Sequence, residues 1–226
     1  MGRLKPSHGR RGQAPPLDAM MATDEFGALA DVTMDDAGAG EESVARALGG
    51  DEKAFGLIFE RYADPIFGFI YRMVGRYDLA EELTQETFVR GYRKLQTLRL
   101  RPDAKLSTWL FSVAKNVARE SLRAKSRESR KVGLSDSLVE ELSDDAAPPD
   151  VLLLNQELNR VIQDALQSLD EDKRMVFTLR VIQQLSYKEI AEITGFSVPK
   201  LKTDLFRARA EMRRLIRPYL EMLDEL

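Results

Sequence analysis

The stretch that most constrains the fold is 185–217, LSYKEIAEITGFSVPKLKTDLFRARAEMRRLIR, which has the pattern of two helices joined by a short turn. Ser186 precedes Glu189 by three residues. This is the spacing of a capping box, in which the serine and glutamate side chains each accept a backbone N–H at the start of a helix. Gly195 supplies the backbone freedom that a tight turn needs. The spacing therefore predicts a helix, a turn and a second helix.

The second of these helices combines an apolar stripe with a basic face. Ser197 is its expected N-cap, and Pro199 is tolerated in its first turn. Residues at helical spacing that we expect to be buried are Leu201, Leu205, Ala208, Met212 and Leu215. Outward or flanking residues are Lys200, Lys202, Thr203, Arg207 and Arg209. A helix-turn-helix of this kind places its basic helix in the major groove of DNA, whereas the alternative is a helical hairpin with merely solvated cations.

Helical periodicity also covers 49–125 and 151–220, and no run favours a β-strand, an internal repeat or a glycine-rich phosphate loop. In the first range we expect four helices, with Pro65 interrupting after the first. Their apolar stripes are Ala54, Phe55, Ile58, Phe59 and Tyr62; Ile66, Phe67, Ile70, Met73 and Val74; Leu79, Leu83, Phe88, Tyr92 and Leu95; and Leu106, Trp109, Leu110, Val113 and Val117. The second range adds Leu158, Val161, Ile162, Ala165 and Leu169, then Met175, Val176, Phe177 and Leu179. The expected fold class is all-α.

Composition divides the chain further. Residues 1–48 mix Gly, Pro, Ala and Asp without periodicity, so we expect a mostly disordered extension, in which Met20, Met21 or Met34 could equally be the start. Residues 126–150 are rich in Ser, Asp and Glu and contain two adjacent prolines, which predicts a flexible acidic linker. The sequence thus predicts two small helical domains, 49–125 and 151–220.

Charge is segregated along the chain, although its net value is only -3. Residues 99–131 hold ten basic and three acidic side chains, and 198–217 hold seven basic and two acidic ones. Between these blocks, 132–157 hold seven acidic side chains and no basic one. Two basic blocks on either side of an acidic one indicate two nucleic-acid-binding surfaces separated by a spacer.

Several classes of protein are excluded by what the sequence lacks. There is no cysteine, and His8 is the only histidine, so disulfides, zinc fingers and Ser-His or Cys-His catalysis are excluded. No nucleophile, base or metal constellation supports a hydrolase, and we expect no cofactor and no metal site. No apolar run approaches the roughly 18 residues that span a bilayer. We therefore expect a protein of the reducing cytoplasm without direct membrane insertion.

Residues 78–93, DLAEELTQETFVRGYR, predict a helix with an acidic surface. Its acidic residues are Asp78, Glu81, Glu82 and Glu86, and Gln85 adds a neutral donor and acceptor. This surface is suited to docking a basic or polar helical partner. The alternatives are a merely solvated face or a metal site, which lacks a histidine or a second carboxylate helix.

Residues 107–123, STWLFSVAKNVARESLR, place the only tryptophan, Trp109, at the head of a basic helix. An aromatic ring beside arginines can hold a single strand, because bases stack on the ring while the cations follow the phosphates. Trp109 could equally be a core residue. Asn116 can both donate to and accept from a base edge, or be a plain surface residue.

These three motifs, in this order, resemble the sigma-70 superfamily of bacterial transcription initiation factors, in the small extracytoplasmic-function type. The resemblance covers about 51–217. The segment 78–93 resembles the family's region 2.2, and the segment 107–123 resembles its regions 2.3 and 2.4. The helix-turn-helix resembles its region 4.2. It implies a helix bundle and a helix-turn-helix domain that together bind core RNA polymerase, at the clamp helices of its largest subunit and its flap, and promoter DNA. It also implies an anti-sigma factor as a further partner.

The resemblance also implies roles for particular residues. It assigns polymerase binding to Asp78, Glu82, Gln85, Glu86 and Phe88. It assigns binding and opening of the minus-ten element to Lys105, Ser107, Trp109, Lys115, Asn116, Arg119 and Arg123. It assigns binding of the minus-35 element to Ser197, Lys200, Lys202, Thr203, Asp204, Phe206 and Arg207.

The chain departs from the family pattern on the recognition helix, where Lys200 replaces a frequent threonine and Asp204 a common arginine. An acid there repels phosphate but can accept a hydrogen bond from cytosine, so Asp204 either tunes the minus-35 sequence or points away. The rival interpretation is a conventional helix-turn-helix regulator that acts without polymerase. Such a regulator would not need the helix that carries Gln85, Glu86, Thr87 and Phe88, or the basic tryptophan segment.

Overall fold

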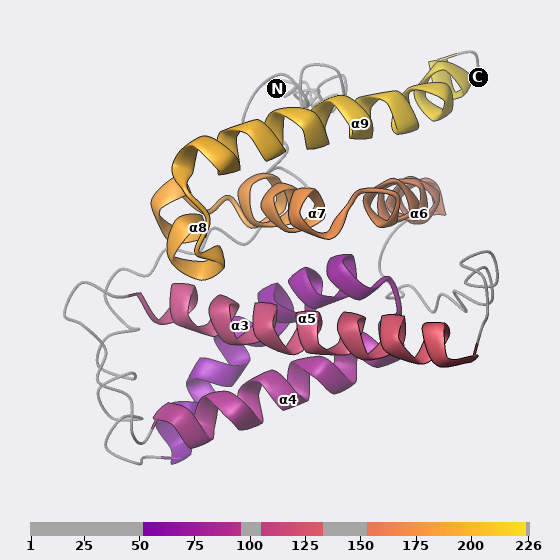
Figure 1. Cartoon of the computed structure of the whole chain (residues 1–226). Coiled ribbons are helices and arrows are strands. Elements are labelled where there is room, and N and C mark those ends of the chain that lie inside the picture. Colours follow the sequence, from indigo (N-terminus) through magenta and orange to yellow (C-terminus); the bar gives the residue numbers. More distant parts are fainter. Residues whose placement is uncertain (1–51, 96–104, 133–152, 225–226) are drawn as a thin grey trace, which may run out of the picture.

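The computed structural model describes residues 52–95, 105–132 and 153–224, and all regular elements in these ranges are helical (Figure 1). One layer holds α3 (Glu52–Val74), α4 (Tyr77–Leu95) and α5 (Leu106–Val132). The other holds α6 (Leu153–Gln167), α7 (Glu171–Phe177), the π-helical segment η3 (Thr178–Ile182), α8 (Tyr187–Thr194) and α9 (Val198–Asp224). The predicted all-α class is confirmed. The expected extension 1–48 and most of the expected linker lie outside the described residues.

Helix α3 is continuous over 23 residues, so the predicted interruption at Pro65 is wrong. Proline inside a helix costs about 3 kcal/mol, because it removes a backbone hydrogen bond. On both sides of Pro65, however, the side chains of Ile58, Tyr62, Ile66 and Phe69 are at most 3% exposed. Burying each such side chain contributes about 1.5–3 kcal/mol, which outweighs the loss at the proline.

Helix α5 reaches Val132, so the predicted start of the linker at residue 126 is wrong. Residues 126–132 include arginine, lysine and glutamate. These straight side chains favour helices even when they are solvated. A segment without an apolar stripe therefore continues the helix that precedes it.

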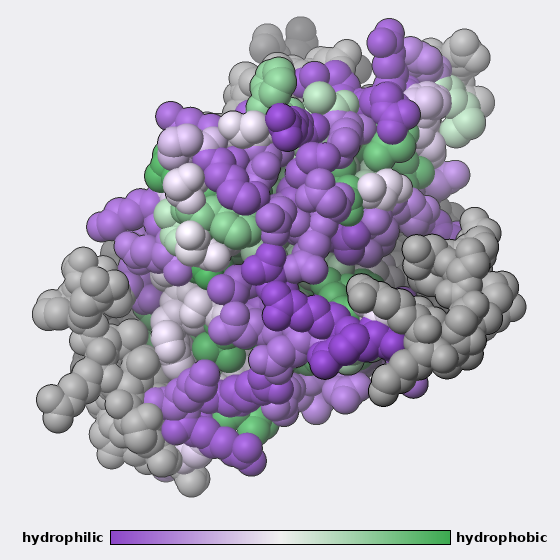
Figure 2. Space-filling model, in the orientation of Figure 1, coloured by the Kyte–Doolittle hydropathy of each residue, from purple (hydrophilic) through white to green (hydrophobic). Residues whose placement is uncertain are grey.

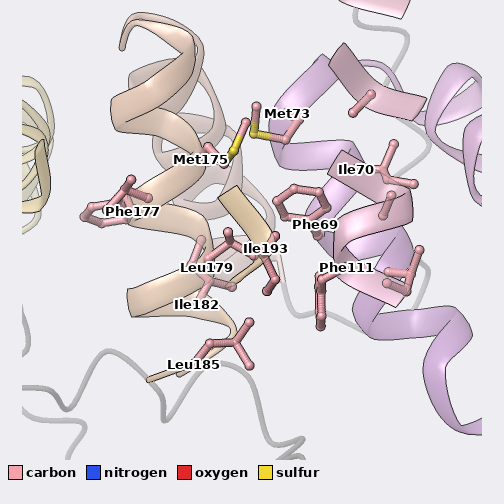
Figure 3. Close-up of a cluster of buried hydrophobic side chains, with 14 of the residues drawn as sticks. Phe69, Ile70, Met73, Phe111, Met175, Phe177, Leu179, Ile182, Leu185 and Ile193 are labelled. Carbon is pink, nitrogen blue, oxygen red and sulfur yellow. The ribbon is translucent and has the colours of Figure 1, made fainter. Parts of the chain in front are cut away.

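The two layers share one apolar core. Phe69 of α3 packs edge-to-face on Phe111 of α5, with ring centroids 5.6 Å apart, and both rings are fully buried. Leu179 and Ile193 of the second layer face these two rings, in a cluster that also contains Met73 and Met175 (Figure 3). Neither phenylalanine was among the predicted apolar stripes. The predicted domains are thus in direct contact, through α3 with α6 and α7 and through α5 with α8.

Polar contacts join the layers at the C-terminal end of α3. The last carbonyl groups of a helix have no partner within it. Here Gln163 Nε2 donates to the Tyr71 carbonyl oxygen at 3.1 Å, and Gln167 Nε2 donates to the Arg72 carbonyl oxygen at 2.9 Å. A third side chain of the second layer, that of Arg174, binds the carbonyl oxygen of Met73. We call the side chains of Gln163, Gln167 and Arg174 the carbonyl clamp.

Arg174 is the charged member of the carbonyl clamp. Its Nη1 donates to the Met73 carbonyl oxygen at 2.6 Å, while its Nη2 donates to the carbonyl oxygens of Gln167 and Leu169 at 2.8 and 3.0 Å. Burial lowers the pKa of Arg174. One guanidinium therefore meets the C-terminal carbonyls of both α3 and α6, where the helix dipoles favour a cation.

The predicted helix-turn-helix is confirmed in its local geometry. Ser186 Oγ accepts from the Glu189 amide at 3.3 Å, and Glu189 Oε2 accepts from the Ser186 amide at 2.7 Å. Gly195 ends α8 in the left-handed region with φ 78°. Ser197 Oγ accepts from the Lys200 amide at 3.4 Å, as expected of an N-cap.

The predicted buried face of α9 is confirmed with one exception. Leu201, Leu205, Ala208 and Met212 are at most 3% exposed. Leu215 is only half-buried, and Ile216, which was not predicted, is 1% exposed. The face of the described residues that Figure 2 shows is mostly hydrophilic, with small apolar patches. Among the described helices, none is long and apolar enough to cross a membrane.

Candidate functional site

The acidic residues of α4 form one exposed face. Asp78, Glu82 and Gln85 are exposed, and they share this face with Glu86 because they lie at helical spacing. Glu86 pairs with Arg90 at 2.7 Å, and Arg90 also pairs with Glu120 of α5 at 2.6 Å. The hydrogen bond from the Arg76 side chain lowers the pKa of Asp78. The four polar residues predicted for polymerase binding therefore lie together.

Phe88, the fifth predicted residue, is not on that face. Its side chain is 3% exposed and packs edge-to-face on the rings of Phe59 and Phe55, with centroids 4.8 and 6.4 Å apart. It lines the floor of a groove of about 600 Å³ between α3 and α4. Gln85 and Val89 line the same groove. Phe88 therefore supports the surface that Gln85 presents.

Two apolar side chains at this groove were missed by the sequence interpretation. Phe59 is 43% exposed, although its place in the apolar stripe of α3 predicted burial. Val89 is 42% exposed, and its position outside the apolar stripe of α4 was the signal available in the sequence. We call the surface formed by Phe59, Gln85 and Val89 the docking groove.

The predicted minus-ten residues lie on α5, except Lys105 just before it, and they fall into two groups. Asn116 and Arg123 are exposed, whereas Ser107, in the first turn, is 3% exposed. Trp109 is half-buried and packs against the core. A Cβ atom added at Gly91 would lie 3.6 Å from its indole ring, an ordinary contact. Trp109 is therefore partly packed in the core and partly accessible to solvent.

The other group contacts the second layer. Lys105 Nζ lies 2.9 Å from Glu189 Oε1, and Lys115 Nζ donates to the Ile193 carbonyl oxygen at 2.7 Å. Burial lowers the pKa of Lys115, and the charge of nearby Arg119 adds to this. Arg119 pairs with Glu171 and with Asp172 of α7. Three of the seven predicted minus-ten residues are therefore engaged between the layers.

The predicted minus-35 residues lie at the start of α9. Lys202, Thr203, Phe206 and Arg207 are exposed, and Phe206 is 76% exposed. Asp204 pairs with Lys200, and the Asp204 side chain is only 13% exposed. In this structure Asp204 therefore faces Lys200 more than the solvent.

Lys200 links this helix to α7. Its Nζ lies 3.0 Å from Asp172 Oδ2 and 4.1 Å from the centre of the Phe196 ring. Burial opposes the charged form, but the hydrogen bonds to Asp204 and Asp172 prevail and raise the pKa of Lys200.

Within the part of the chain that the structure describes, no group of three or more His, Asp or Glu side chains could hold a metal.

Family comparison agrees with this arrangement. Residues 58–128 match the model of Sigma-70 region 2, and residues 159–212 match that of Sigma-70, region 4. Regions 2 and 4 in this order define the sigma factors of bacterial transcription initiation. The chain is 32% identical over 185 residues to the ECF RNA polymerase sigma-E factor of Haemophilus influenzae, covering 78% of this chain and 95% of that protein. It is also 32% identical over 182 residues to the sigma-E factor of Escherichia coli strain K12, covering 78% of this chain and 94% of that protein. This chain belongs to the ECF sigma factors of the sigma-70 family.

Solved structures share the fold. One is the sigma factor RpoE in complex with the anti-sigma factor NepR from Bartonella quintana, with 24% identity and a TM-score of 0.59, covering 73% of this chain and 98% of that chain. Another is CnrH in complex with the cytosolic domain of CnrY, with 25% identity and a TM-score of 0.57, covering 78% of this chain and 96% of that chain.

Proposed function

We propose that this sigma factor binds core polymerase through the α4 face and the docking groove, and contacts promoter DNA through α5 and α9. The observation that carries this proposal is the presence, in one chain, of an acidic docking helix followed by two basic helices. The proposed units are 49–132 for polymerase and the minus-ten element, since α5 extends to Val132, then 133–150 as connection and 151–220 for the minus-35 element. The chain acts by binding, without covalent chemistry, in the cytoplasm.

The docking groove suits a helical partner. Phe59 and Val89 expose apolar area beside Gln85, whose amide offers both a donor and an acceptor. The acidic side chains Asp78 and Glu82 lie on the same helix and favour a basic partner by charge. The clamp helices of the polymerase's largest subunit are the proposed partner, with the polymerase flap as a second contact for the C-terminal unit.

The two basic helices are proposed to contact different promoter elements, α9 the minus-35 duplex and α5 the minus-ten strand. On α9, Lys202, Phe206 and Arg207 are exposed on the helix that follows the turn, the geometry with which helix-turn-helix proteins enter the major groove. On α5, Asn116 and Arg123 are exposed seven and fourteen residues after the partly exposed Trp109, and this spacing puts all three on one side of the helix, as a strand that runs along it needs. An anti-sigma factor is proposed as a regulator, supported by the solved sigma factor RpoE, which was captured with the anti-sigma factor NepR.

Strand opening with core polymerase tests the function. We expect promoter thymines to become reactive to permanganate only when the chain and core polymerase are both present. Asn116→Ala should lower this reactivity about tenfold, because a base-edge contact contributes about 1–3 kcal/mol, while binding to a minus-35 duplex stays unchanged. Opening by polymerase alone, or duplex regulation without polymerase, would reject the sigma assignment. Normal opening by Asn116→Ala would remove that residue from the site.

The recognition helix permits a second test. Lys202→Ala should weaken minus-35 binding about equally for all sequences and lower the salt slope by about one, because it removes a phosphate contact. Asp204→Arg should raise general affinity and change the preferred sequence. Transcription of a promoter library measures both effects, with Arg213→Ala as a control for an exposed cation further along α9. An unchanged sequence profile for Asp204→Arg would show that Asp204 reads no base.

A further inference from the structure

Helix α4 has ends of opposite charge, and the groove between α3 and α4 reaches its basic end. Phe55, near the start of α3, packs edge-to-face on Tyr92, with ring centroids 4.9 Å apart. Arg93 is exposed and lines the groove beside this pair, and the neighbouring Lys94 is also exposed. The first turn of α4 instead carries the exposed Asp78. The basic end of α4 therefore lies at the start of α3, and its acidic end lies further away.

The N-terminal extension joins the described chain at this basic end. Helix α3 begins at Glu52, three residues before Phe55. Helix α4 packs against α3 and α5, on the side of the first layer that faces away from α6–α9 (Figure 1). A segment that comes from the start of α3 can therefore reach the groove without passing the second layer.

The charges of the extension come in two blocks. Residues 17–36 hold six acidic side chains and no basic one, and residues 1–16 hold four basic side chains and no acidic one. Counted back from α3, the acidic block comes first and the basic block second. Along α4 the basic end comes first and the acidic end second, so each block meets opposite charge when the extension runs along this helix.

The length of the extension fits this path. Fifteen residues, 37–51, separate the acidic block from α3, and they span at most about 50 Å. Helix α4 measures about 22 Å from Arg93 to Asp78, at a rise of about 1.5 Å per residue. The acidic block can therefore reach every part of the groove, and the basic block can reach the far end of α4.

The acidic block also supplies an apolar side chain for the groove. Phe26 lies in its middle and is the only Phe, Tyr or Trp residue in 1–51. Phe59 and Val89 of the docking groove are 43% and 42% exposed. An aromatic ring laid on these side chains buries apolar area on both partners, which favours binding.

We propose that residues 1–36 lie along α4 in the free chain, with Phe26 in the docking groove, and that core polymerase must displace them. The competition with polymerase rests on the proposed function, whereas the contact itself does not. A segment that orders only when it binds gains little affinity for the area that it buries, so a tighter partner can replace it. Only molecules with an empty groove bind polymerase, and the apparent affinity falls by that fraction.

Paramagnetic broadening in the full chain tests the contact. A nitroxide label at Ala28→Cys should broaden the amide signal of Val89 and leave that of Ile216 on α9 unchanged. The chain has no cysteine of its own to interfere. Phe26→Ser in the labelled chain should remove most of the broadening at Val89. The matched control is Val44→Ser, an apolar residue outside both blocks, which should keep the broadening.

Two outcomes of this experiment would overturn the inference. One is an unbroadened Val89 signal in the labelled parent, or an equal loss of broadening in Phe26→Ser and Val44→Ser. The other is broadening in a mixture of a labelled chain with an isotope-enriched chain that carries no label, because it would show that a second copy fills the groove.

Reversing one charge tests the order of the two blocks. Arg11→Glu should reduce the broadening at Val89 about twofold, because it replaces attraction to the acidic end of α4 by repulsion. Arg46→Glu reverses one charge outside both blocks and should leave the broadening unchanged. An equal effect of the two variants would overturn the alignment of the blocks with α4.

Polymerase binding tests the competition. We expect Phe26→Ser to raise the affinity for core polymerase about threefold to tenfold, and Val44→Ser to stay within about twofold of the parent. Equal affinities of the parent and Phe26→Ser would overturn the inference. Failure of every variant to bind polymerase, with the broadening at Val89 present, would instead reject the proposed function and leave the contact standing.

Discussion

Phe59→Asp is expected to weaken binding to core RNA polymerase roughly 30-fold or more, the effect of losing about 2 kcal/mol at the centre of an interface. The Phe59 ring is 43% exposed at the docking groove, so the variant removes apolar contact area without emptying the core. It also places a charge where an apolar partner surface would exclude water. Fluorescence anisotropy with labelled polymerase measures the change.

Leu57→Asp is the matched control. Leu57 is 53% exposed on the same helix, but it does not line the docking groove. This variant should bind polymerase within about twofold of the parent, as surface changes outside an interface usually do. Both variants should keep the parent's melting temperature within a few degrees. If Phe59→Asp folds and binds polymerase like Leu57→Asp, the groove is not the docking surface.

Phe69→Ala is expected to lower the free energy of unfolding by about 3–5 kcal/mol, the usual cost of removing a buried phenylalanine ring. The side chain is fully buried and packs edge-to-face on Phe111. Because this pair faces residues of both layers, both layers should lose stability together. Urea unfolding followed by circular dichroism measures the loss, and Leu57→Ala on the exposed side of α3 should change stability by less than about 1 kcal/mol.

The shared core also predicts how two signals of the same unfolding experiment compare. Trp109, the only tryptophan, reports on the first layer, while circular dichroism reports on all helices. In the parent chain the two signals should give the same midpoint, because one continuous core couples the layers. Two separate midpoints in the parent would show that the layers unfold independently.

Features that depend on near neighbours in the chain were predictable. The capping box of Ser186 and Glu189, the left-handed Gly195 and the buried face of α9 all follow from local sequence, and all are present. The predicted interruption at Pro65 failed because burial on both sides of the proline decides the matter, and burial is not a local property. Phe111 was missed because α5 packs against α3, α4 and α8, which buries a wider arc than one apolar stripe.

The contacts between the layers had no local signal. Arg119 and Asp172 are 53 residues apart, and Lys115 and Ile193 are 78 apart, so no spacing pattern joins them. The sequence identified Lys115 and Arg119 as cations for DNA, but it could not indicate their partners in the free chain. The exposure of Asp204 was equally unpredictable, because it depends on how Lys200 is held by α7.

The carbonyl clamp makes the two halves of the molecule unequal in how they can diverge. On α3 the acceptors are main-chain oxygens of Tyr71, Arg72 and Met73, which any residue would supply. On the other half the donors are particular side chains, those of Gln163, Gln167 and Arg174. Substitutions at 71–73 therefore leave the acceptors of these hydrogen bonds in place, whereas substitutions in the carbonyl clamp remove the donors. In a chimaera of two sigma factors, compatibility at this junction would be inherited through the C-terminal parent.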